Sequence, residues 1–282
     1  MSIEAAAKPA SLEAKSPFEM RVKLGDGVSE TDVKSALRTG DMGFLHSFTT
    51  GSAVDGPGIR LVAWTTSCNF RCQFCHNPDT WTLSNGIPVA LEQATDEIRK
   101  YANGLKRMGG GFTLSGGEPL MQHRFAARLF GAAKQMGLHN AIETNGVYGE
   151  KLSDRELQDI DLIILDMKGF SEEQHERVTG GMTNQAVLQF AHRLASLQRP
   201  MWIRYVLVPG LTDVETEIAQ LAVFAASLGV VERVQVLPFH QLGAYKWERL
   251  GLDYRLAQTE PPTSVQVEDA AAIFRSAGLL AA

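Results

Sequence analysis

The sequence of 282 residues has few cysteines and no long hydrophobic run. No apolar stretch approaches the roughly 20 residues that cross a bilayer, and the N-terminus lacks the apolar centre of a secretory signal. Only three cysteines occur, all between residues 68 and 75. An odd, clustered set argues against a disulfide framework, which needs pairs spread over the fold. We therefore expect reduced thiols and a cytoplasmic protein.

Basic charge and phosphate-binding glycine motifs are also lacking. The chain has 27 Lys and Arg against 32 Asp and Glu, so its formal net charge is −5. Nucleic acids and anionic membranes attract proteins with a positive field, and neither partner is expected here. The stretches GGG (109–111) and SGG (115–117) lack GxGxxG spacing, and no GxxxxGK[ST] occurs, so nucleotide-loop chemistry is not supported.

Short strand-like runs alternate with helical patterns from about residue 43 onward. The predicted strands cover residues 59–66, 111–115, 139–144, 162–167, 201–208 and 233–239. The predicted helices cover residues 90–108, 122–136, 184–198 and 213–229, with Thr212 and Asp213 as N-terminal caps of the last helix and Gly229 as its end. Such alternation predicts a parallel α/β sheet with right-handed crossovers, either open or a barrel of fewer than eight strands.

The first 40 residues differ in composition from the rest. They are rich in Ala, Ser, Glu and Lys, contain Pro9 and Pro17, and show no sustained periodicity. We interpret residues 1–40 as an N-terminal extension whose composition is compatible with partial disorder. Residues 41–282 are predicted to form one domain.

The three cysteines, Cys68, Cys72 and Cys75, form the most informative pattern. A structural zinc site needs four ligands, and only His76 offers a local fourth, directly adjacent to Cys75 and therefore poorly placed. An iron–sulfur cube normally takes four thiolates, so three would leave one iron without a protein thiolate. An electron carrier gains nothing from such a position, whereas an enzyme can bind a substrate there.

Unusual polar residues follow the predicted strands. They are the stretch SGGEP (115–119), the stretch ETNG (143–146), Asp166, Lys168 and His240. Because the carboxyl ends of parallel strands share one face, these residues should converge near the cysteines. Taken singly, each also has a structural interpretation: a tight turn for Gly116 and Gly117, a helix cap for Glu118, a surface ion pair for Asp166 and Lys168, a packed histidine for His240.

The pattern Cys68-x3-Cys72-x2-Cys75, with Phe74 before the last cysteine, resembles the signature of radical S-adenosylmethionine (radical SAM) enzymes, and SGGEP resembles their glycine-rich motif. Further stretches resemble the pyruvate formate-lyase-activating enzymes within that superfamily. They are VDGPGIR (54–60), CHNPDTW (75–81), ETNG, LDMK (165–168), WIRYVLVPG (202–210) and LPFHQLGAYKWERLG (237–251). This resemblance extends from about Gly43 to the C-terminus.

The resemblance implies a partial (β/α)6 TIM-like barrel and a defined reaction. A 4Fe-4S cluster, held by Cys68, Cys72 and Cys75, would bind SAM at its open iron. One-electron reduction would cleave SAM to methionine and a 5′-deoxyadenosyl radical, which would remove a Cα hydrogen from a glycine of pyruvate formate-lyase under anaerobic conditions. A glycine has no side chain to obstruct that approach.

The resemblance also implies roles for individual residues. Gly116, Gly117 and Glu118 would receive the methionine ammonium of SAM, and Lys168 would pair with its carboxylate. The remaining cofactor contacts would be Asp166, Met167 and His240 near the ribose or carboxylate, Phe74 and His76 near the adenine, and Arg204 at the cofactor or the incoming loop. Arg204 serves equally well as a structural ion-pair partner.

A monovalent cation is a further implied ligand. Its loop in the family begins with Asp, and Glu143 stands at that position here, followed by Thr144. The longer side chain changes ligand reach, so the cation site is an open question. Its candidate ligands are Glu143, Thr144 and Asp166.

The electron should come from a separate protein. The chain has no further cysteine for a second cluster, so a flavodoxin or ferredoxin docking near the cysteines is expected. Alternatives are an activase of another glycyl radical enzyme, a radical enzyme acting on a small molecule, an electron carrier, and a zinc-binding structural or regulatory protein.

Overall fold

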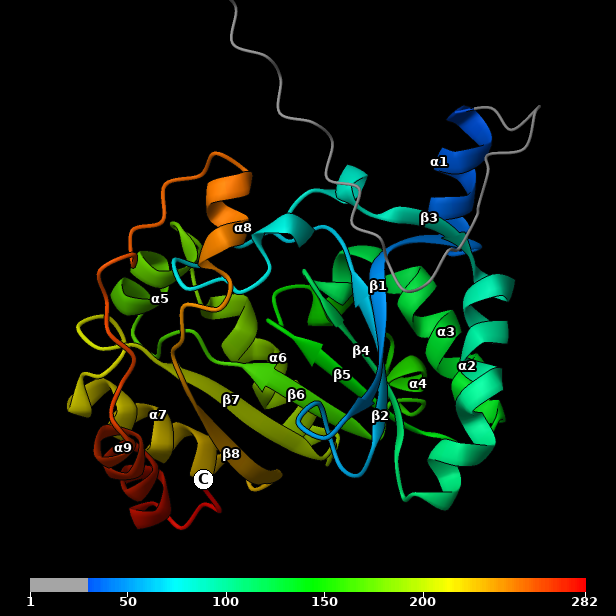
Figure 1. Ribbon diagram of the computed structural model, residues 1–282. Coiled ribbons are helices and arrows are strands. Elements are labelled where there is room, and N and C mark those ends of the chain that lie inside the picture. Colours follow the sequence, from blue (N-terminus) through cyan, green and yellow to red (C-terminus); the bar gives the residue numbers. More distant parts are fainter. Residues whose placement is uncertain (1–29) are drawn as a thin grey trace, which may run out of the picture.

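The structure, a computed structural model, describes the backbone of residues 30–282 and the side chains from residue 35 onward (Figure 1). One eight-stranded sheet has the order β3-β1-β2-β4-β5-β6-β7-β8. The strands are β1 (Met42–Ser52), β2 (Arg60–Thr65), β3 (Ile87–Ala90), β4 (Gly111–Gly116), β5 (His139–Thr144), β6 (Leu162–Asp166), β7 (Met201–Leu207) and β8 (Val231–Pro238).

The six predicted strands are β2 and β4 to β8, and each pairs in parallel with the next. The sheet is open, because β3 and β8 are its two edges. The predicted parallel α/β architecture of six strand–helix units is therefore confirmed.

The helices pack around this sheet (Figure 1). They are α1 (Glu30–Thr39), α2 (Leu91–Arg107), α3 (His123–Gln135), α4 (Asp154–Leu157), α5 (Glu172–Thr179), α6 (Gln185–Ser196), α7 (Glu215–Ser227), α8 (Ala244–Arg249) and α9 (Ser264–Ser276). In α2, the residues Ala94, Ile98, Ala102 and Leu105 recur on one face and are buried. Within residues 30–282, none of the helices combines the length and the apolar character that a membrane span requires.

The four predicted helices are confirmed as α2, α3, α6 and α7, but the predicted cap of α7 is wrong. Val214 precedes α7 and provides no side-chain cap. The Thr212 hydroxyl instead donates to the carbonyl of Val206, 2.7 Å away, and Asp213 accepts from the amide of Gly210 at 2.8 Å. Both side chains therefore stabilise the turn after β7. The predicted end of the helix is confirmed, since Gly229 has a φ of +68°.

Two elements of the amino-terminal region were not predicted. Strand β1 pairs antiparallel with both β2 and β3, and so extends the parallel sheet at one edge. Helix α1 lies within the predicted extension, whose residues 1–29 are outside the described part of the chain. A half-buried strand is recognised by alternating apolar and polar residues. In β1 the apolar residues Phe44 and Leu45 are adjacent, so this alternation is weak.

Arg60, at the start of β2, joins the amino ends of three strands. Its side chain is fully buried and donates to the Thr113 hydroxyl (2.9 Å), to the carbonyl of Phe112 (2.5 Å) and to the carbonyl of His139 (3.0 Å). Burial lowers the pKa of Arg60 to about 10. Arg60 thus joins the strands at their amino ends, on the side of the sheet opposite to the carboxyl ends.

We predict that Arg60→Met lowers the free energy of unfolding by about 3 kcal/mol, because it leaves buried acceptors without their donor. The matched control is Arg107→Met, since Arg107 is exposed, and it should change stability by less than about 0.5 kcal/mol. Urea unfolding followed by circular dichroism measures both. Equal midpoints for the two variants would contradict this role.

Candidate active site

A pocket of about 480 Å³ opens where the parallel strands end at their carboxyl termini. The sequence-predicted residues that line it are Cys68, Cys72, Phe74, Cys75, His76, Gly116, Gly117, Glu143, Thr144, Asp166, Lys168, Arg204 and His240. Residues from five strand ends and the loop after β2 therefore meet at one place. Glu118 and Met167 are not among the lining residues.

The cysteine loop, residues 68–75, is held by backbone hydrogen bonds from two other segments. The amide of Cys68 donates to the carbonyl of Trp81 at 3.1 Å, and the amide of Arg71 donates to the carbonyl of Thr179, at the end of α5, at 2.8 Å. The indole of Trp247, in α8, donates to the carbonyl of Cys75 at 2.9 Å. The positions of the thiols are thus set by the fold itself.

The three thiols are partly or fully buried, and burial raises their pKa. The pKa of Cys68 rises to about 12, and those of Cys72 and Cys75 also lie above the ordinary thiol value. Without a bound cation these groups are neutral thiols. Binding of a metal centre would release their protons, because the thiolate is the ligand.

The arrangement of donors distinguishes between two metal centres. Among residues 30–282, no three His, Cys, Asp or Glu side chains gather closely enough to hold a single metal ion. His76 packs its ring against that of His240, with centroids 5.0 Å apart, rather than closing a site with the thiols. A one-ion zinc site is therefore not assembled. A four-iron cube takes each thiolate on a different iron, so three separated thiols around one pocket fit it.

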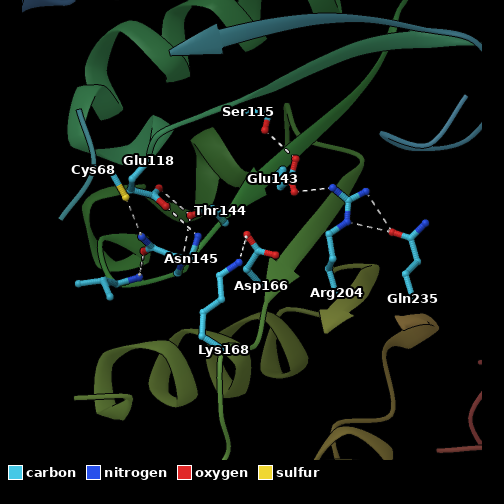
Figure 2. Close-up of polar contacts among 12 residues, drawn as sticks. Cys68, Ser115, Glu118, Glu143, Thr144, Asn145, Asp166, Lys168, Arg204 and Gln235 are labelled. Carbon is cyan, nitrogen blue, oxygen red and sulfur yellow. Dashed lines mark hydrogen bonds and ion pairs between the residues drawn. The ribbon is translucent and has the colours of Figure 1, made fainter. Parts of the chain in front are cut away.

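Asp166 and Lys168 form an ion pair inside the pocket, with Nζ and Oδ2 3.1 Å apart (Figure 2). Their side chains are only 15% and 13% exposed, so the interpretation as a surface pair is wrong. Burial opposes the charge of Lys168, yet Asp166 keeps the pKa of Lys168 above its usual value. The second carboxylate oxygen, Oδ1 of Asp166, is buried and has no hydrogen-bond partner. An acceptor is therefore left for a ligand.

Arg204 reaches the pocket from β7 and pairs with Glu143 of β5 (Figure 2). It also donates to the carbonyl of Val54 at 2.8 Å and lies 3.6 Å from Asp55. Ser115 donates to the other oxygen of Glu143 at 2.6 Å. Although burial opposes it, the Arg204 guanidinium holds the pKa of Glu143 below its usual value. The structural ion pair expected for Arg204 is thus present.

These contacts bear on the cation prediction. Both oxygens of Glu143 already accept from protein donors, and the Thr144 hydroxyl donates to Glu118 at 2.7 Å. Among the three candidate ligands, the unpartnered Oδ1 of Asp166 is the oxygen that stays available.

Glu118 is buried next to the pocket loops and does not line the pocket. It is fully buried and accepts from the amides of Leu120 (2.9 Å) and Asn145 (2.7 Å) and from the hydroxyl of Thr144 (2.7 Å) (Figure 2). Burial raises the pKa of Glu118 to about 7, against these three donors. Its cap interaction with the short helix Pro119–Gln122 is confirmed, and its carboxylate ties the ETNG loop to the SGGEP loop.

Met167 was predicted to contact the cofactor, but its side chain does not line the pocket. Its side chain is 1% exposed and packs in the main hydrophobic core. Met167 follows the last residue of β6, and successive residues of an extended chain point to opposite sides. Asp166 and Lys168 therefore face the pocket while Met167 faces the core.

Gly116 and Gly117 bring two loops into direct backbone contact. The amide of Gly117 donates to the carbonyl of Thr65 at 2.9 Å. A Cβ atom on Gly116 would lie 2.2 Å from the carbonyl oxygen of Thr65, and one on Gly117 would lie 2.4 Å from that of Ser67. Gly116 also has a φ of +128°, which L side chains rarely adopt. The pair thus permits the close approach that sets the cysteine loop.

Several lining residues had no predicted role. Asp55 and Val54 belong to the stretch VDGPGIR, and Asn145 belongs to ETNG. The Asn145 amide lies 4.0 Å from the sulfur of Cys68 and 3.0 Å from the side-chain oxygen of Asn69. Each of the two stretches marked the site, but the sequence did not indicate which of their side chains face the pocket.

We predict that Gly116→Ala destabilises the protein by more than about 2 kcal/mol, because the new Cβ collides with backbone atoms and the φ is strained. Gly104→Ala is the matched control. Gly104 lies in α2 with open space at its Cβ position, so this change should stabilise the protein by up to about 1 kcal/mol. Thermal unfolding of the metal-free variants tests the difference, and a neutral Gly116→Ala would refute it.

Comparisons with known proteins agree with this geometry. A family profile described as the Radical SAM superfamily matches residues 62–222. A protein of Staphylococcus epidermidis named pyruvate formate-lyase-activating enzyme is 40% identical over 235 residues, covering 81% of this chain and 93% of its own length. The protein of the same name from Staphylococcus aureus has the same identity and coverage.

Solved structures show the same fold. A domain of a pyruvate-formate lyase-activating enzyme from Bacteroides vulgatus is 26% identical, with a TM-score of 0.52, covering 62% of this chain and 98% of that domain. A radical SAM methyltransferase from Sphaerobacter thermophilus is 14% identical, with a TM-score of 0.57, covering 91% of this chain and 82% of that one. At that identity the second likeness concerns the fold alone.

Proposed function

This chain belongs to the radical SAM superfamily, and from that premise we propose that it activates pyruvate formate-lyase by generating a radical on one of its glycines. The relatives that carry this name in two staphylococci match over 93% of their length. The observation that carries the proposal is the pocket itself. Three thiols and a buried Asp166–Lys168 pair face one cavity at the carboxyl ends of the sheet.

The superfamily implies a 4Fe-4S cluster and SAM, and the residues present fit both. Cys68, Cys72 and Cys75 would hold the cluster through three of its irons. When bound, the cluster and SAM together supply the one-electron cleavage that yields a 5′-deoxyadenosyl radical, the species that takes the glycine Cα hydrogen. The protein contributes position, charge and exclusion of water.

The charges of the pocket suit SAM. At neutral pH SAM carries a sulfonium, an ammonium and a carboxylate, so its net charge is positive. Of the charged lining residues, Asp55, Glu143 and Asp166 are acidic, and Lys168 and Arg204 are basic. Arg204 neutralises Glu143, which leaves Lys168 and Asp166 as the pair that a zwitterionic ligand can open.

We assign the contacts accordingly. Lys168 pairs with the methionine carboxylate, while the unpartnered oxygen of Asp166 accepts from the ammonium, a ribose hydroxyl or a monovalent cation. Backbone groups of Gly116 and Gly117 lie beside the methionine moiety. Glu118 acts as a positioning residue, because its carboxylate is already used within the protein.

Aromatic lining residues complete the cofactor contacts. Phe74 lies within the cysteine loop, His76 directly follows it and His240 follows β8, and all three line the pocket. The ring of Phe74 lies 5.4 Å from the Lys168 ammonium. These side chains offer stacking and hydrogen-bonding surfaces for the adenine and ribose.

Exposed apolar side chains near the pocket favour a protein substrate. Val54 lines the pocket and is 66% exposed, and Leu242, two residues after His240, is 71% exposed. The sheet is open between its edges, so a loop can approach without crossing a closed barrel. A glycine at the tip of such a loop could reach the pocket.

The proposed function is tested by mixing the anaerobically reconstituted protein with SAM, a reductant and pyruvate formate-lyase. We expect a glycyl doublet by electron spin resonance and an amount of 5′-deoxyadenosine that matches it. Other glycyl radical enzymes serve as parallel substrates. A doublet with one of them and none with pyruvate formate-lyase would overturn the assignment of the partner.

Two variants separate cluster binding from cofactor binding. Cys72→Ala should lose both iron and SAM cleavage, because two thiolates cannot hold the cube. Lys168→Ala should retain about four irons and weaken SAM binding by about tenfold to a hundredfold, since it removes a charge-assisted hydrogen bond. Lys106→Ala, on exposed α2 surface, is the control. Normal SAM affinity in Lys168→Ala, measured by equilibrium dialysis, would show that the assignment of Lys168 is wrong.

A further inference from the structure

A second groove, of about 240 Å³, lies on another side of the cysteine loop. Its lining residues are Arg71, Gln73, Trp81, Arg177, Gly180, Trp247, Asp253 and Arg255. Arg177 belongs to α5 and Trp247 to α8, which lie near each other at one end of the sheet in Figure 1. We call this feature the arginine groove.

The arginine groove is positively charged in an acidic protein. Arg71, Arg177 and Arg255 are exposed, and one carboxylate, Asp253, accompanies them. Three guanidinium groups against one carboxylate contrast with the net charge of −5 for the whole chain. A local field of this sign attracts an acidic partner and raises its rate of association.

Two residues that line the arginine groove donate hydrogen bonds to the backbone of the cysteines that would hold the cluster. Arg71 donates to the carbonyl of Cys68 at 2.8 Å, and Trp247 donates to the carbonyl of Cys75 at 2.9 Å. Trp81 lines both the groove and the thiol pocket. The groove is thus a surface from which a partner approaches the cysteine loop without entering the thiol pocket.

We propose that the arginine groove is the docking surface for an acidic one-electron carrier protein. This rests on the proposed function, which needs one electron for each SAM cleaved. All three cysteines of the chain are in the cysteine loop, so the chain has no thiolates for a second cluster of its own. In the exchange the carrier is oxidised by one electron and the bound cluster is reduced by one.

The glycine substrate uses a different surface. It must reach the thiol pocket, where the exposed residues Val54 and His240 are lining residues, and neither of them lines the arginine groove. The two partners can therefore contact different sets of exposed residues.

The test compares charge-reversal variants in the reconstituted enzyme. Arg177→Glu and Arg255→Glu, singly and together, are assayed for SAM cleavage with reduced acidic flavodoxin as the probe. The matched control is Arg107→Glu, because Arg107 and Arg177 are both exposed and both lie in the last turn of a helix. Photoreduced 5-deazariboflavin, a small neutral reductant, replaces the protein donor in a parallel assay.

We expect the double variant to lose about tenfold or more of the flavodoxin-dependent rate at low ionic strength. The difference should shrink in about 0.5 M salt, because salt screens exposed charges. Rates with 5-deazariboflavin should be unchanged in every variant. Calorimetric titration with oxidised flavodoxin should show the same loss of affinity, without any turnover.

Two outcomes would overturn the proposal. The first is an unchanged flavodoxin-dependent rate and affinity in the double variant. The second is a loss of glycyl radical formation with 5-deazariboflavin, which would assign the groove to the substrate protein. Absence of SAM cleavage by the wild-type enzyme with 5-deazariboflavin would instead reject the proposed function itself.

Discussion

The site depends on how the backbone of the cysteine loop is fixed. Hydrogen bonds join this loop to the segment at Trp81, to the end of α5 at Thr179, and to α8 through Trp247. Ordering a loop costs conformational entropy, and these hydrogen bonds offset part of that cost. Burial raises the pKa of Cys68, so binding of a cluster would be coupled to loss of the thiol protons. The protein positions the three thiols, and the positive charge of the bound iron would keep them deprotonated.

A set of buried polar contacts lies beside this loop. Glu118 ties the loop after β4 to the loop after β5 by accepting from Thr144 and Asn145. The Glu143–Arg204 pair is satisfied by protein partners, whereas Oδ1 of Asp166 is buried without a hydrogen-bond partner. A buried acceptor without a donor is costly. The proposed SAM contact at the Asp166–Lys168 pair would supply the missing donor.

The sequence predicted the parallel sheet because strand-like and helical patterns alternate cleanly from β2 to β8. It also predicted many of the residues that meet in the pocket, because their positions after strand ends require convergence. It did not predict β1, where adjacent Phe44 and Leu45 weaken the alternation. The Met167 side chain packs in the core although the residue lies within the predicted motif, because a motif does not say which side chains face a site. The arginine groove was missed because Arg71, Arg177 and Arg255 come from separate segments that only the fold brings together.

The cysteine loop contributes lining residues to both the thiol pocket and the arginine groove. The central claim is that three thiolates leave one iron of the cube open to SAM. The most direct measurement is the electron spin resonance spectrum of the reduced cluster before and after SAM is added. A shift of its g values on SAM binding is predicted. An unchanged spectrum, in a sample for which equilibrium dialysis shows that SAM is bound, would contradict the account.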